Sequence, residues 1–246
     1  ETLASMLADQ GIPYPEDVIE RGWQILLQNQ FHDIVPGTCI EAVYDQTDRE
    51  YEEIYMRGKS ALKKLAAEGA KTVYTKNNAI IVYNTQCYVR DDLVFVEGLS
   101  DVGTVRAADE MDKDIPVQKT WDGRTVFYAE GIPALGIKVF YYVPGNPGSS
   151  LQTWDRQFEN EFYNVTFNEE MEIISLIEKD TGKEFIQEGK KGNELVTYED
   201  RPMNWDNWDI DVYYKKKPYK AERVSEIRVL EDGAVRKTLE IQKQFA

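Results

Sequence analysis

Residues 1–70 carry apolar side chains at helical spacing. Apolar positions recur every three to four residues in three runs, which is typical of helices with one buried face. The predicted helices cover residues 2–9, 16–30 and 39–68. Thr38, with Glu41 three residues later, predicts a capping box at the start of the third helix, and Gly69 predicts its end.

Two long antiparallel helices cannot bury their apolar faces by themselves. We therefore expect residues 2–9 to be the remnant of a third helix, in a bundle truncated at its N-terminus. A chain that opens at Glu1 and not at a methionine agrees with a processed product or an excised piece.

The pattern changes near residue 70 to short β-type runs separated by Gly and Asp. Turn signals stand at Asp122-Gly123, Thr181-Gly182 and Asp232-Gly233, and Asn146–Ser150 is the best candidate for a linker. Strands are predicted at 79–83, 92–96, 115–119, 125–129, 137–143, 161–167, 172–178, 193–198, 223–231 and 234–242.

The sequence thus predicts an α+β multidomain chain, a truncated antiparallel helical bundle followed by β-sandwich-type sheets. The expected domains are a helical-bundle middle domain at 1–70, a small β-sandwich-like domain at 71–148, and the beginning of a larger β-sandwich at 149–246.

Charge narrows the classes of partner. The formal net charge is −15, which argues against binding to nucleic acid or to an anionic membrane surface and leaves a neutral sugar or a cation possible. No apolar run is long enough to span a bilayer. Cys39 and Cys87 make neither a disulfide framework nor a metal motif, so we expect reduced thiols in a cytoplasmic protein.

His32 is the only histidine, and it stands beside Asp33 between the two long predicted helices. Spacing alone favours a capping or packing histidine. A zinc site needs about four ligands, and neither a second histidine nor a cysteine cluster supplies them. A metal held by His32 would therefore require ligands from outside this chain.

Residues 23–44, which contain Asn29-Gln30-Phe31-His32-Asp33-Ile34-Val35-Pro36-Gly37-Thr38, resemble the middle-domain helix hairpin of glycoside hydrolase family 38, the retaining α-mannosidases. Similar landmarks follow in order at Tyr83–Arg90, Ile132–Gly136, Glu159–Tyr163 and Asn204–Asp211. Gln86, Cys87 and Tyr88 depart from the Leu-Ser-Trp that is usual in the family.

The resemblance implies one part of a zinc-dependent enzyme that hydrolyses terminal α-mannosides of glycans or oligosaccharides. In that family the nucleophile and most zinc ligands lie in an N-terminal β/α catalytic domain, which is missing here and would be the partner of this chain. By this resemblance His32 is a zinc ligand and Asp33 binds mannose hydroxyls. The catalytic residues of this chain are then unknown, and the chain alone should be inactive.

Two alternatives stay open. One is a carbohydrate-binding β-sandwich module without hydrolysis, with Trp205 and Trp208 lining a groove; the other is a structural scaffold or oligomerisation piece. The alternation of Trp208, Ile210 and Val212 with acidic residues favours a half-buried strand over a sugar site. Whether His32 is exposed beside Asp33 or packed inside distinguishes the enzyme hypothesis from the others.

Overall fold

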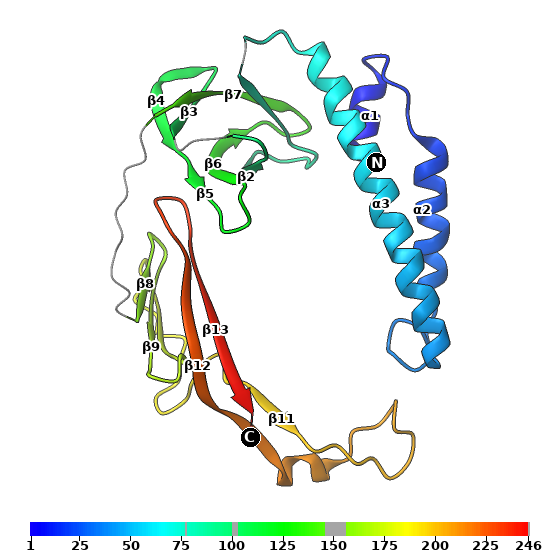
Figure 1. Ribbon diagram of the computed structural model, residues 1–246, viewed down its shortest axis with the longest axis vertical. Coiled ribbons are helices and arrows are strands. Elements are labelled where there is room, and N and C mark those ends of the chain that lie inside the picture. The colour runs from blue at the N-terminus through cyan, green and yellow to red at the C-terminus, as the bar shows by residue number, and fades with distance from the viewer. Residues whose placement is uncertain (77, 100–102, 146–155, 246) are drawn as a thin grey trace. The chain divides into compact units, whose positions relative to one another are not determined.

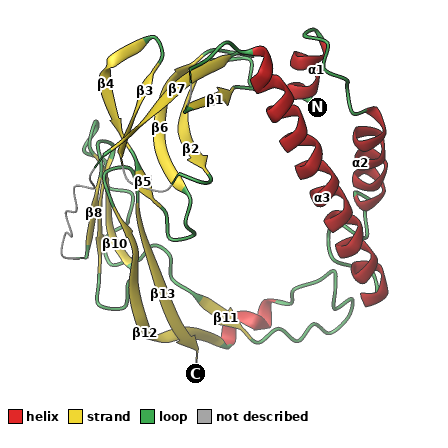
Figure 2. Cartoon of the chain, turned by 45° about the horizontal axis from the view of Figure 1, so that its top comes forward, coloured by secondary structure: helices red, strands yellow, loops and turns green. Residues whose placement is uncertain are grey.

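Three helices open the chain in the computed structural model, which describes residues 1–76, 78–99, 103–145 and 156–245 (Figure 1). They are α1 Thr2–Ala8, α2 Glu16–Asn29 and α3 Glu41–Thr72. α2 and α3 run antiparallel and lie side by side in both views (Figures 1 and 2). Leu3, Leu7 and Leu65 bury an apolar contact between α1 and α3. The three predicted helices are confirmed.

Both predicted end signals of α3 are wrong. The N-cap residue is Ile40, whose apolar side chain makes no capping bond, and the Thr38 hydroxyl lies within hydrogen-bond distance of Asp33 in the preceding turn. Gly69 does not end the helix but lies buried within it. A Cβ at Gly69 would stand 2.6 Å from the Tyr83 hydroxyl and 2.9 Å from Leu7 Cδ2, so glycine here permits close packing.

Antiparallel sheets follow the helices, which confirms the α+β class. One sheet has the strand order β1-β7-β3-β4 and another the order β2-β6-β5. Their strands are β1 Ala79–Tyr83, β2 Arg90–Val96, β3 Gly103–Ala107, β4 Glu110–Pro116, β5 Gln118–Lys119, β6 Thr125–Ile132 and β7 Ile137–Pro144. The predicted strand 115–119 is divided between β4 and β5, and β3 and most of β4 were not predicted from the sequence.

The later strands form two three-stranded sheets of orders β10-β9-β8 and β11-β12-β13. β12 and β13 make a long hairpin that turns at Gly233, near the predicted Asp232-Gly233 turn (Figure 1). The elements are β8 Gln157–Glu159, β9 Tyr163–Phe167, β10 Ile173–Glu178, β11 Val196–Tyr198, the 3₁₀ helix Val212–Lys216, β12 Pro218–Asp232 and β13 Lys237–Phe245.

The chain divides into two compact units. The first is formed by Glu1–Val96, Ser100–Val117 and Val126–Asn146, and the second by Glu97–Leu99, Gln118–Thr125 and Pro147–Ala246. The three-domain division at 1–70, 71–148 and 149–246 stays a prediction. The expected linker Asn146–Ser150 lies outside the described residues.

Each unit is stabilised in a different way. The first has an apolar core in which Phe127 and Phe140 meet edge to face with ring centroids 5.1 Å apart. In the second, the buried Glu231 carboxylate accepts two hydrogen bonds from Arg236, at 2.6 and 2.7 Å, and one from the Trp121 backbone N–H at 2.9 Å. The Arg236 guanidinium lowers the pKa of Glu231.

No helix in the described part of the chain is both long and apolar enough to cross a membrane.

Candidate functional site

The candidate site is the turn between α2 and α3, which carries His32 and Asp33. α2 ends at Asn29, and the chain then turns through residues 31–37. Two backbone N–H groups, those of Ile34 and Val35, donate to the Phe31 carbonyl at 2.9 and 3.1 Å. Gly37 has a φ of 87°, a left-handed conformation that glycine adopts without strain, and it lets the chain reverse toward α3.

Hydrogen bonds fix Asp33 in this turn. Its backbone carbonyl accepts the Thr38 N–H at 3.0 Å and the Tyr44 hydroxyl at 3.2 Å. The Thr38 hydroxyl lies 3.0 Å from Asp33 Oδ1. Tyr44 also accepts the Cys39 N–H at 2.9 Å, so this tyrosine of α3 joins both ends of the turn. The half-buried Asp33 carboxylate therefore keeps a defined position.

His32 lies exposed beside this carboxylate. Its side chain is 75% exposed, and Nε2 lies 3.5 Å from Asp33 Oδ2. The Phe31 ring is its neighbour on the other side, with ring centroids 4.2 Å apart. His32 is not a packing histidine, because most of its surface faces solvent. This is the arrangement expected for the enzyme hypothesis.

A buried polar cluster holds the two helices together directly before the turn. Asn29 is 2% exposed, and its amide donates to Glu50 Oε2 at 2.7 Å and to the Ile25 carbonyl at 3.0 Å. Its Oδ1 accepts the Thr47 hydroxyl at 2.8 Å. Hydrogen bonds from Gln46 and from Asn29 lower the pKa of Glu50. Asn29 belongs to the motif at residues 29–38, but the sequence pattern does not indicate this role.

The two candidate side chains can supply a metal with at most one imidazole and one carboxylate. Within the described residues, no group of three or more His, Cys, Asp and Glu side chains converges as a metal site. An exposed imidazole beside a carboxylate suits zinc chemically, but two ligands do not complete a zinc site. The donor set therefore fits a shared site better than one contained in this chain.

The segment Trp205–Asp211 is not a half-buried strand, and that prediction is wrong. It forms a turn and a loop before the 3₁₀ helix, in which Trp205 and Trp208 are exposed. The Trp208 N–H donates to the Trp205 carbonyl at 2.7 Å, a turn that breaks the strand geometry. Alternation of apolar and acidic residues describes this loop as well as it describes a strand, so periodicity alone could not separate them.

Two other sequence landmarks form a structural corner of the first unit. The buried Asn84 donates to the carbonyls of Tyr88, at 2.8 Å, and Ile132, at 3.1 Å. The Leu135 N–H donates to the Gln86 carbonyl at 2.8 Å. Tyr83–Arg90 and Ile132–Gly136 are thus neighbours in space, and their hydrogen bonds give them a role in folding.

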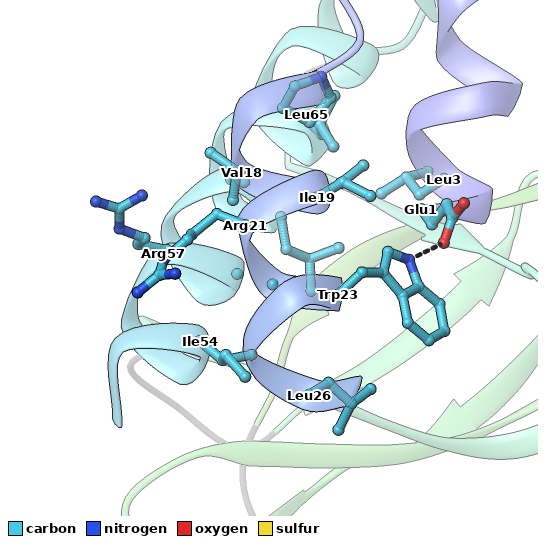
Figure 3. A pocket seen from close by; sticks show the side chains of 15 residues that line it. Glu1, Leu3, Val18, Ile19, Arg21, Trp23, Leu26, Ile54, Arg57 and Leu65 are labelled. Atoms are coloured by element: carbon cyan, nitrogen blue, oxygen red, sulfur yellow. Dashed lines mark hydrogen bonds between the residues drawn. The ribbon is translucent and has the colours of Figure 1, made fainter. Parts of the chain in front are cut away.

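A further pocket lies along the helices (Figure 3). Its walls are mostly apolar side chains of α2 and α3, such as Val18, Ile19 and Ile54. At its edge the Trp23 indole N–H donates to the Glu1 carboxylate at 3.0 Å. Glu1, Arg21 and Arg57 also line the pocket, but most of its lining side chains are apolar.

Comparison with protein families gives two matches. The model of the alpha mannosidase middle domain matches residues 1–68, which include His32 and Asp33. The model of the glycosyl hydrolases family 38 C-terminal domain matches residues 158–246. Together the two models match more than half of the chain, in the order predicted from the sequence landmarks.

Curated relatives carry the same family name. Human alpha-mannosidase 2C1 is 28% identical over 203 residues, which are 82% of this chain and 18% of the relative. Alpha-mannosidase G of Dictyostelium discoideum is 23% identical over 251 residues, covering 89% of this chain and 23% of the relative. The chain therefore spans about a fifth of the length of these relatives.

The fold also matches a solved structure. A crystal structure of an alpha-mannosidase from Enterococcus faecalis V583 superposes with a TM-score of 0.68 at 17% identity, covering 99% of this chain and 32% of that one. The family models, the curated relatives and this fold agree. The chain belongs to glycoside hydrolase family 38, the α-mannosidases, and it carries sequence of their middle and C-terminal domains.

Proposed function

We propose that this chain is part of a retaining, zinc-dependent α-mannosidase that hydrolyses terminal α-mannosides of glycans or oligosaccharides. The observation that carries the proposal is the exposed His32 imidazole, held beside Asp33 in a hydrogen-bonded turn within the region that the middle-domain model matches. An exposed histidine in a rigid turn is able to bind a metal without first unpacking from a core.

His32 is the proposed zinc ligand in this chain. Its neutral imidazole is a common donor to zinc, and the other ligands would come from the N-terminal catalytic domain. The Asp33 carboxylate, 3.5 Å from Nε2, is close enough to influence the orientation of the ring. Bound zinc would act as a Lewis acid that holds sugar hydroxyls in a ring geometry close to that of the transition state.

Asp33 is the proposed acceptor for mannose hydroxyls. Oδ1 is engaged by the Thr38 hydroxyl at 3.0 Å, which fixes the plane of the carboxylate. Oδ2 then remains near His32 and, being half-buried, can accept a sugar hydroxyl with little loss of side-chain freedom. A position fixed before the substrate arrives favours orientation of the terminal mannose.

The covalent chemistry is assigned to residues outside this chain. A retaining glycosidase needs a nucleophile and an acid/base about 5–5.5 Å apart, and the resemblance gives these to the N-terminal domain. Since the chain spans 18% of human alpha-mannosidase 2C1, ample sequence exists in that relative for such a domain. By itself the chain should not hydrolyse mannosides.

The test uses the full-length parent protein with His32→Ala. Zinc content and hydrolysis of p-nitrophenyl α-mannoside are measured, with circular dichroism as a check of folding. We expect bound zinc to fall below stoichiometric and kcat/KM to drop by at least about 100-fold, because loss of a direct ligand should cost more than loss of an outer-shell partner.

Val35→Ala is the matched control. Val35 lies in the same turn and its side chain is exposed, but it carries no donor for zinc or sugar. Both zinc content and turnover should survive in Val35→Ala. Unchanged zinc and unchanged turnover in a folded His32→Ala protein would rule out the metal assignment and favour the alternative, a carbohydrate-binding module without hydrolysis.

A further inference from the structure

The loop of residues 203–211, here called the tryptophan loop, exposes several large apolar side chains together. Met203, Trp205, Trp208 and Ile210 are each between 62% and 73% exposed. Several large exposed apolar side chains within one short loop indicate an interaction site more often than an isolated exposed residue does. We propose that the tryptophan loop is a binding surface for a neutral oligosaccharide, formed by residues other than His32 and Asp33.

The loop is held by its own backbone, not by burial of its rings. The Trp208 and Asp209 N–H groups donate to the Trp205 carbonyl at 2.7 and 2.9 Å. At its base the Met203 N–H donates to Asp211 Oδ2 at 2.8 Å. Trp205 has a φ of 57°, which is unfavourable for a bulky residue and is retained here by these hydrogen bonds. The backbone positions that carry the indoles are thus defined by hydrogen bonds within the loop.

Carboxylates accompany the two indoles. Asp206 and Asp209 are exposed, and within the described part of the chain neither forms an ion pair with a lysine or arginine. An ionised carboxylate accepts several hydrogen bonds and pairs well with vicinal hydroxyls. An indole offers a broad apolar face to the C–H side of a sugar ring. The loop therefore offers both kinds of contact that a sugar ring requires.

The acidic residues argue against a protein partner as the occupant. The centres of protein–protein interfaces are depleted in Asp, whereas this loop has three within six residues, Asp206, Asp209 and Asp211. Aromatic and acidic side chains would also suit an organic cation. The choice of an α-mannose oligosaccharide as ligand class rests on the proposed function, since α-mannosides are the substrate class proposed for the parent protein.

The experiment measures binding without turnover. Isothermal titration of the full-length parent protein with a thio-linked α-mannotriose, whose sulfur linkages resist hydrolysis, is compared with the double variant Trp205→Ala/Trp208→Ala. We expect the double variant to bind the trisaccharide at least about tenfold more weakly, as when aromatic anchors are removed from a contact surface. A second variant, Asp209→Asn, keeps side-chain size and should also weaken binding if the carboxylate accepts sugar hydroxyls.

Trp121→Ala is the matched control, because Trp121 is 64% exposed and lies in the same unit but outside the loop. It should bind the trisaccharide as the parent does. Equal affinity in the parent and in both loop variants would overturn the proposal, and so would binding of tetramethylammonium but not of the trisaccharide. Hydrolysis of p-nitrophenyl α-mannoside by the parent is measured separately. Loop-dependent binding in a parent without hydrolysis would uphold this inference while the proposed function failed.

Discussion

Short polar side chains fix the turns of this chain, and one of them stands directly before the candidate site. Asn29 closes the α2–α3 contact, Asn84 closes a corner of the first unit, and Asn160 accepts the Phe162 and Tyr163 N–H groups between β8 and β9. Asn84 and Asn160 pair with backbone groups at corners of the chain, whereas Asn29 joins α2 to the Glu50 and Thr47 side chains of α3. At residue scale, Asn29 thus joins the two helices directly before the turn that carries His32.

Asn29→Ala should destabilise the helical part of the first unit by about 2–3 kcal/mol. The substitution removes an amide that is 2% exposed and leaves the Thr47 hydroxyl and the Glu50 carboxylate short of a partner. The free energy of unfolding is measured by urea denaturation of this chain. Gln46→Ala is the control: Gln46 also donates to Glu50, at 2.7 Å, but is exposed, so its loss should cost less than about 0.5 kcal/mol.

The loss in unfolding free energy caused by Asn29→Ala should depend on pH. The pKa of Glu50 is lowered in the folded chain, so its ionisation stabilises the fold above the ordinary carboxyl pKa and ceases to do so as pH falls through the folded value. Asn29→Ala removes one of the two donors, so part of its cost should vanish below about pH 4. A difference from the unsubstituted chain that stays constant from pH 7 to pH 3 would mean that Glu50 does not take part.

At the scale of elements, the sequence predicted that the helices exist but did not predict where α3 begins and ends. The apolar period of α2 and α3 reflects one face of each helix packed against its neighbour, and that face extends over many residues. An end depends on single hydrogen bonds. α3 begins two residues later than the capping sequence predicts, with Ile40 as its N-cap, and the Thr38 hydroxyl donates to Asp33 in the preceding turn. The capping sequence was present, but Thr38 lies outside the N-cap position from which its oxygen could accept an N–H of the first turn.

Burial explains only part of the strand prediction, because β3, Gly103–Ala107, was missed although Val105 and Ala107 are buried. β6 buries Val126 and Phe127 and was predicted, whereas β4, Glu110–Pro116, is exposed at nearly every position and has no apolar alternation to detect. The tryptophan loop has the alternation but is not a strand. Alternation of apolar and polar residues predicts a strand reliably only when one face of that strand packs against another layer. β4 and the tryptophan loop are both largely exposed, so the pattern fails for them.

Gly69→Ala should destabilise the chain although alanine favours helices. A Cβ at this position would approach the Tyr83 hydroxyl to 2.6 Å and Leu7 Cδ2 to 2.9 Å, and the buried contact between α1, α3 and β1 would have to open. We expect a net loss of about 1–3 kcal/mol in the free energy of unfolding, after the roughly 1 kcal/mol that alanine gains in a helix. Thermal and urea unfolding of the substituted chain measure it.

Gly58→Ala provides the matched control in the same helix. No atom lies within 4 Å of a Cβ at Gly58, so only the helix propensity changes, and the substitution should stabilise the chain by up to about 1 kcal/mol. Opposite signs for the two glycines would establish close packing at Gly69. If both substitutions stabilise, the approach of Tyr83 to Gly69 is looser than the structure shows.

At the scale of the whole molecule, the sequence identified a candidate site but not a complete set of metal ligands. One histidine in a chain of 246 residues left no ambiguity about a candidate ligand, and the structure places it exposed beside Asp33. The rest of a zinc site could not be predicted from this chain, because the described residues do not bring a third donor to His32 and Asp33. Zinc takes about four ligands, so a chain that supplies one or two of them cannot identify the rest of the site.

The chain alone should accordingly bind zinc weakly, with a dissociation constant on the order of 100 µM or higher, since one imidazole and one carboxylate cannot replace the four ligands of a stable site. The full-length protein should bind one zinc far more tightly, because ligands from two domains then converge. Isothermal titration of both proteins with zinc chloride at pH 7 measures the difference, and His32→Ala should lower the affinity of the longer protein much more than that of the chain. Tight, stoichiometric binding by the chain, abolished by His32→Ala, would contradict this expectation. It would mean that further ligands reach His32 within these 246 residues.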